Sequence, residues 1–206
     1  ELVDELQEKM NKGSGGGGGG GKATAPVQVT LSVEDRDALL AVSADGLICQ
    51  SRAERAWSGG RATAGVVSGR HYWEMLCRDE GLCRVGWATK AAVLDLGTDK
   101  HGFGFGGTGK KSNNRQFDAY GEAYGAGDFI GCLLDCDGGT ISFTKNGKDL
   151  GVAFAIPKFL HGQVFYPAVA LKNAELICNF GGASFKHPPP AGFAGIAAAR
   201  PEQLRV

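Results

Sequence analysis

The chain has 206 residues, of which 43% are hydrophobic and 21% charged, and it carries 22 basic and 22 acidic residues. This size and composition predict one well-buried domain with tails. The zero net charge excludes a general attraction to nucleic acid or membranes, so an electrostatic function requires local clusters of charge. Because no apolar run reaches the length of a membrane-spanning helix, we expect a soluble, intracellular protein.

The first 26 residues are predicted to form a short helix followed by a tether. Apolar residues recur at helical spacing over residues 1–12, which indicates the end of an amphipathic helix. The glycine run from Gly15 to Gly21 predicts a flexible linker over residues 13–26. The start, ELVDELQEKMNK, lacks a Met and is too charged for a signal peptide, so we expect a fragment of a longer protein.

Short apolar runs separated by Gly, Asn and Asp follow from about residue 37. Regularly spaced strands with turn signals are typical of an antiparallel sandwich or barrel, and Asn146-Gly147 is a strong hairpin signal. No long helical pattern lies between the runs, which argues against a parallel α/β fold. The predicted strands lie in ALLAVS (38–43), GLICQS (46–51), HYWEMLC (71–77), LCRVGWA (82–88), DFIGCLLD (128–135), TISFTK (140–145), VFYPAVAL (164–171) and AELICNF (174–180).

The stretch GFGFGGTGKKSNN (102–114) is similar in spelling to a phosphate-binding loop. Gly104, Gly109 and Lys110 fit that motif, but Lys111 stands where a Ser or Thr must bind magnesium. Neither a buried strand before it nor a helix after it is indicated. We therefore interpret the stretch as a glycine-rich loop with a basic tip, which still contacts phosphate by charge alone.

Other catalytic and metal motifs are incomplete. The six cysteines form no CxxC pair, so buried free thiols are expected. Asp135, Asp137 and Gly138 begin like a calcium loop but lack its later ligands, and a strand ending in an Asp-Gly turn is the better interpretation. No group of nucleophile, base and orienting residue is present, so no catalytic residue is assigned.

Four blocks in order resemble the SPRY domain, a bent antiparallel β-sandwich. They are GRHYWEM (69–75), GLCRVGWAT (81–89), GDFIGCLLDCDGGTISFTKNGKDLGVAF (127–154) and YPAVAL (166–171). The resemblance implies an all-β fold of two antiparallel sheets over residues 27–196, with residues 197–206 as a tail returning to the parent protein.

A closer resemblance is to the SPRY insert of the DEAD-box RNA helicase subfamily numbered one. It is carried by DLGTDKHGFGFGGTGKKSNNRQFDAYGE, LKNAEL and NFG. It implies that residues 1–12 end a helix of a helicase lobe, and that the true P-loop and the DEAD box lie outside this chain. ATP and magnesium are then expected only in the parent helicase core, with no cofactor here, and the parent is expected in the nucleus and cytoplasm.

Basic residues gather in a few turn-rich segments. If these loops converge, they form a positive patch that binds an acidic protein segment or an RNA backbone; otherwise they are a solvated surface. Trp57, Phe105, Phe117, Tyr120 and Tyr124 interleave with them, either stacking on bases or packing in the core. The candidate binding residues are Arg52, Arg55, Arg78, Arg84, Lys110, Lys111 and Arg115.

The sequence favours a non-catalytic interaction module that presents its loops to a protein partner. An alternative is an accessory RNA surface through Lys110, Lys111 and Arg115, which salt dependence would reveal. A third possibility is an insert that packs on the helicase lobes and modulates their closure.

Overall fold

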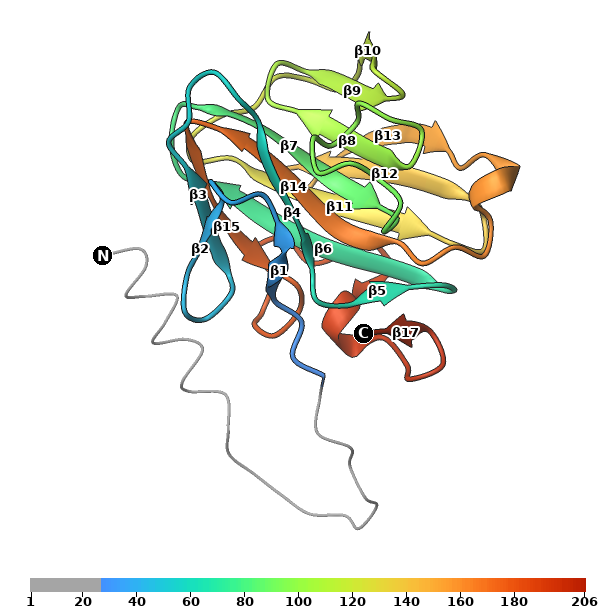
Figure 1. Ribbon diagram of the computed structural model, residues 1–206. Helices are drawn as coiled ribbons and strands as arrows, with labels where there is room; N and C mark the ends of the chain where they lie inside the picture. The colour runs from blue at the N-terminus through green and yellow to red at the C-terminus, as the bar shows by residue number, and fades with distance from the viewer. Residues whose placement is uncertain (1–26) are drawn as a thin grey trace.

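The computed structural model describes residues 27–206 as two layered β-sheets (Figure 1). The predicted helix and glycine linker lie outside these residues. The first sheet has the strand order β1-β4-β14-β7-β8-β9-β10. Its strands are β1 (Leu31–Arg36), β4 (Ser58–Ala62), β14 (Tyr166–Lys172), β7 (Leu82–Ala88), β8 (Gly102–Gly106), β9 (Lys110–Asn113) and β10 (Gln116–Ala119).

The second sheet has the order β13-β12-β11-β6-β15-β3-β2, with β16 added in parallel to β6. Its strands are β13 (Lys148–Ala155), β12 (Thr140–Lys145), β11 (Phe129–Asp135), β6 (Arg70–Cys77), β15 (Ala174–Asn179), β3 (Ile48–Ser51), β2 (Ala41–Val42) and β16 (Ala194–Gly195). Every predicted apolar run overlaps a strand, and the all-β antiparallel sandwich is confirmed.

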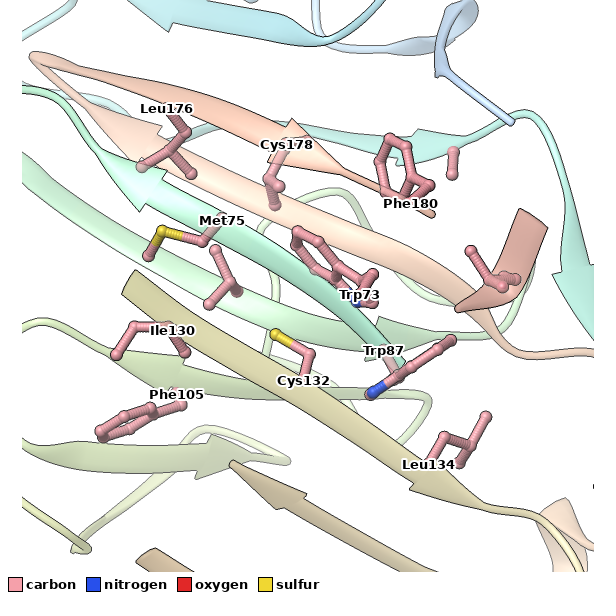
Figure 2. Packing of buried hydrophobic residues seen from close by; sticks show 14 of the residues in the cluster. Trp73, Met75, Trp87, Phe105, Ile130, Cys132, Leu134, Leu176, Cys178 and Phe180 are labelled. Atoms are coloured by element: carbon pink, nitrogen blue, oxygen red, sulfur yellow. The ribbon is translucent and has the colours of Figure 1, made fainter. Parts of the chain in front are cut away.

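The core lies between the two sheets, where alternate side chains of facing strands interdigitate. Figure 2 shows Trp73 and Met75 of β6 packed beside Ile130, Cys132 and Leu134 of β11. Trp73 and Trp87, which lie within predicted strands, are fully buried. The cysteines behave as small core residues: all six are free, with Cys49, Cys77, Cys83, Cys132 and Cys178 buried and Cys136 half-buried.

The glycine-rich stretch before Lys110 is a buried strand, so its interpretation as a loop was wrong. The rings of Phe103 and Phe105 are buried in β8, and the intervening glycines let neighbouring segments of the chain approach. A Cβ on Gly86 of β7 would lie 2.0 Å from the carbonyl oxygen of Phe103. Only residues 107–109 form the turn, and Lys110 and Lys111 belong to β9.

The two ends of the described chain meet on one segment. Leu31 pairs with Ala62 in β4, while Arg205 pairs with Gly65. The latter contact joins β5 (Gly65–Val66) to β17 (Leu204–Arg205) in a separate two-stranded sheet, visible beside the C-terminus in Figure 1. The chain therefore enters and leaves the domain side by side.

The C-terminal residues pack on the domain. Two short 3₁₀ helices, η1 (Lys158–Leu160) and η2 (Ile196–Ala198), occur, and no α-helix is found within residues 27–206. Ile196 is fully buried and Phe193 is half-buried, as apolar anchors should be. Leu204 is buried as well and anchors the last residues of the chain. Residues 197–206 therefore add contacts to the sandwich.

Candidate functional site

Several loops that are distant in sequence meet at one end of the sandwich, here called the loop end. Strand pairing sets Lys172 opposite Leu82 and Ala174 opposite Ser51. The amide of Gly107 donates to the carbonyl of Cys83, so the β8–β9 turn lies beside the start of β7. The loop end thus consists of loops 52–57 and 78–81, turn 107–109 and the turn at residue 173.

A groove of about 330 Å³ opens on the outer face of the first sheet next to the loop end. Its floor is the guanidinium of Arg84, which lies 3.9 Å from the ring centroid of Trp57 and 5.1 Å from that of Phe117. Phe117 is 42% exposed. The lining residues are Trp57, Leu82, Cys83, Arg84, Gly106, Gly107, Thr108, Lys110, Ser112 and Phe117. The groove therefore combines cationic and aromatic surface.

Arg84 is held firmly in this groove. Its Nη1 donates to Asp95 Oδ1 at 3.0 Å and to the carbonyl of Leu96 at 3.2 Å. Burial lowers the pKa of Arg84, while the Asp95 carboxylate acts in the opposite direction. Two aromatic rings and one carboxylate fix the guanidinium plane, which leaves little side-chain entropy to lose on binding.

Two lysines at the rim supply the free positive charge. Lys110 is exposed, and neither it nor Lys172 forms a salt bridge with any residue that the structure describes. The Lys172 ammonium lies 5.3 Å from the centroid of the Trp57 ring. A partner that brings a carboxylate here meets two cations that are not yet neutralised.

The structure brings some of the seven candidate residues together. Arg52 lies at the loop end and pairs with Asp79 at 2.7 Å, while Arg78 pairs with Glu175 at 3.8 Å. Arg55 is exposed in the same loop as Arg52, with no salt bridge among residues 27–206. Much of the predicted positive charge is therefore already balanced by acidic partners. Of the seven candidates, Arg84 and Lys110 line the groove.

Two of the candidates lie elsewhere. Strand alternation turns Lys111 away from Lys110, and its Nζ donates to the carbonyl of Ala153 at 2.7 Å. Arg115 occupies the β9–β10 turn with φ of 60°, and its amide donates to Gly97 at the far end of the hairpin. Lys110, Lys111 and Arg115 do not form one continuous surface.

Neither Lys172 at the rim nor Asp95, the carboxylate that holds Arg84, was predicted from the sequence. Lys172 follows YPAVAL, and its side chain takes the same face as Ala170 by simple alternation. Pairing Leu82 and Arg84 of β7 with this strand would have indicated it. No comparable signal marks Asp95, because it lies in the irregular segment between β7 and β8.

Neither a metal-binding cluster nor a membrane-spanning helix is found among the described residues. Within residues 27–206, no group of three or more His, Cys, Asp or Glu side chains is arranged to hold a metal ion. Asp135 Oδ1 accepts from the amide of Gly138, so LDCDGG is a strand that ends in a turn. In the same residues, no helix has the length and hydropathy needed to cross a bilayer.

Residues 70–183 match the SPRY domain family. The ATP-dependent RNA helicase Ddx1 of Drosophila melanogaster is 58% identical over 178 residues, which cover 86% of this chain and 24% of the helicase. Heterogeneous nuclear ribonucleoprotein U-like protein 2 of Mus musculus is 37% identical over 161 residues, covering 71% of this chain and 22% of that protein. This chain thus spans about a quarter of the length of the curated relatives that it matches.

The solved structure of the SPRY domain of human HERC1 has the same fold. It superposes with a TM-score of 0.63 at 22% sequence identity, covering 77% of this chain and 99% of that one. At this identity the likeness concerns the fold alone. The family match over residues 70–183 covers more than half of the chain and leads to one conclusion: the chain belongs to the SPRY domain family.

Proposed function

We propose that this SPRY domain is a non-catalytic interaction module that binds an acidic protein segment in the groove at its loop end. SPRY domains are protein-interaction modules. The observation that carries the proposal is the fixed guanidinium of Arg84 between Trp57 and Phe117, beside the free charges of Lys110 and Lys172. Such a site suits an aromatic or apolar side chain flanked by carboxylates.

We further propose that the domain is carried as an insert by an ATP-dependent RNA helicase of the nucleus and cytoplasm. Of the two relatives given above, the one of higher identity carries that name. The side-by-side chain ends support this, because an inserted domain must return the chain close to where it left. ATP and magnesium then belong to the parent core.

The position of the groove favours a separate partner over an intramolecular one. β4 runs from Ser58, beside the loop end, to Ala62, where the chain enters the domain. The chain ends and the groove therefore lie at opposite ends of the same strand. A groove directed away from the connections is open to a protein in solution.

Peptide binding to the 206-residue chain tests the proposal. The probe is a fluorescein-labelled peptide in which a central Trp is flanked by glutamates, followed by fluorescence polarisation. We expect Lys110→Glu with Lys172→Glu to weaken binding at least about tenfold, because both rim charges then repel the peptide. Trp57→Ala should weaken it too, and replacing the peptide's glutamates by glutamines should abolish it.

The matched control is Lys100→Glu with Lys158→Glu, which reverses two exposed lysines near the other end of the sandwich. This control variant should bind the labelled peptide as tightly as the unmodified chain does. Peptide binding that ignores the groove substitutions, or that weakens equally with the control pair, would contradict the assignment of the groove.

A further inference from the structure

A second basic and aromatic surface lies near the end of the sandwich opposite the loop end. Its centre is Phe159 of η1, whose side chain is 51% exposed. The Lys100 ammonium lies 5.2 Å from its ring centroid, and the His101 ring meets it edge-on at 5.8 Å. We call Lys100, His101, Lys158 and Phe159 the Phe159 patch.

The register places this patch away from the groove. β14 begins at Tyr166, shortly after η1, and runs to Lys172 at the loop end. β8 likewise begins directly after His101 and ends beside the turn 107–109. The two surfaces are therefore separated by the length of the first sheet, and a ligand can occupy one without touching the other.

The positive charge of the patch is not neutralised within the described residues. Lys100 and Lys158 are exposed and form no salt bridge in residues 27–206. The nearest carboxylate in sequence, Asp99, uses Oδ2 to accept from the amide of Val93 and Oδ1 to accept from that of His101. It caps the loop while the lysine ammonium groups remain available.

Arg115 extends the same surface. The amide of Asn114 donates to the carbonyl of Asp99, and that of Arg115 donates to Gly97. The tip of the β9–β10 hairpin therefore lies against the loop that carries Lys100. The exposed guanidinium adds a third cation at this end.

Phe159 is exposed but its backbone is fixed. Its neighbour Leu160 is 2% exposed and anchors η1 in the core. The amides of Leu160 and His161 donate to Pro157 and Lys158, which closes the turn. An outward aromatic ring on a rigid turn is a ready stacking platform, because little freedom is lost when a ring stacks on it.

We propose that the Phe159 patch binds single-stranded RNA. A base stacks on the free face of Phe159, while Lys100 and Lys158 contact the flanking phosphates. Single-stranded nucleic acid offers a planar ring and a phosphate at every residue, which matches a ring flanked by cations. Oligoglutamate, an acidic chain without rings, would use the lysines and leave the Phe159 ring with no defined role.

The test is a titration of the 206-residue chain with fluorescein-labelled oligouridine at several salt concentrations. Phe159→Ala should lower the association constant by roughly fivefold or more, the usual loss of one stacked base, and Phe159→Tyr should retain binding. Lys100→Glu with Lys158→Glu should lower it further and reduce the slope of log K against log salt by about 1.4, two released counterions on a single strand.

The control variants lie at the groove. Phe117→Ala removes a comparably exposed ring, and Lys110→Glu reverses an exposed charge. Both should bind RNA like the unmodified chain, with unchanged thermal melting for all variants. The proposal is overturned if oligouridine does not bind at low salt, if Phe117→Ala weakens binding as much as Phe159→Ala, or if oligoglutamate depends on Phe159 in the same way.

Discussion

A buried carboxylate holds the chain segment 183–190, here called the strap, against the outer face of the second sheet. Glu74 of β6 is 2% exposed; its Oε1 accepts from the amide of Lys186 at 2.8 Å and its Oε2 from that of His187 at 2.9 Å. The Tyr72 hydroxyl donates to the carbonyl of His187 at 2.9 Å. Substituting Glu74 therefore removes both acceptors of the strap at once.

The expected loss follows from these contacts. Hydrogen bonds to a charged group contribute about 1.5–3 kcal/mol each, but the strap is partly exposed and water replaces some of the loss. We therefore expect Glu74→Ala to lower the free energy of unfolding by about 2–3 kcal/mol. For a domain of this size that corresponds to roughly 4–12 °C in melting temperature. Tyr72→Phe removes the hydrogen bond to the carbonyl of His187 and a longer one, of 3.4 Å, to Glu74 Oε2, and it should cost about 1 kcal/mol.

Hydrogen exchange distinguishes a local clamp from a general loss of packing. In Glu74→Ala the amides of Lys186 and His187 should exchange much faster, while core amides change only with global stability. Tyr72→Phe serves as the milder comparison, since it leaves both amide acceptors in place. If the two strap amides kept the protection of the unmodified chain in Glu74→Ala, the clamp would be disproved whatever the melting temperature.

Four other outcomes are expected. Burial raises the pKa of Glu74, so the folded state binds its proton more readily, and the stability difference from Glu74→Gln in urea unfolding should shrink as pH rises above the ordinary glutamate pKa. Gly86→Ala should unfold or misfold the chain, whereas Gly125→Ala, with open space around it, should melt normally. Arg115→Gly should stabilise by about 1 kcal/mol in the same urea assay, because φ of 60° strains a side chain. Burial raises the pKa of Cys136 to about 12, so mass spectrometry should find it unalkylated by iodoacetamide at neutral pH.

The apolar runs predicted strands in which large side chains alternate, and among the strands that they missed are two rich in glycine. β4 reads SGGRA and β8 reads GFGFG, yet all their residues are buried. A Cβ on Gly59 would lie 1.8 Å from the carbonyl of Leu94, in the segment that covers the outer face of the first sheet. Glycine is required there because another segment of the same chain passes close by. The periodicity of the sequence alone does not reveal this contact.

The candidate site was predictable by residue type and not by pairing. The sequence identifies Arg52, Arg78 and Arg84 as basic, but their acidic partners are set by which loops meet. The opposite directions of Lys110 and Lys111 follow from strand alternation, and this would have been evident had residues 110–113 been assigned as a strand. Only the structure therefore shows which of these arginines are neutralised by an acidic partner.

The placement of the two surfaces relative to the chain ends suggests how one sandwich serves two ligands. The groove lies at the loop end, while the chain enters and leaves near Ala62 and Gly65 at the other. The Phe159 patch lies toward the latter end, since η1 precedes β14 there. In the proposed parent, the patch would thus lie on the side of the helicase lobes and their RNA, and the groove on the side open to proteins.

A chain that carries Lys100→Glu, Lys158→Glu should accordingly lose oligouridine and keep the acidic peptide, while Lys110→Glu, Lys172→Glu should do the reverse. Loss of both ligands in either pair would mean that the two ends are one coupled surface.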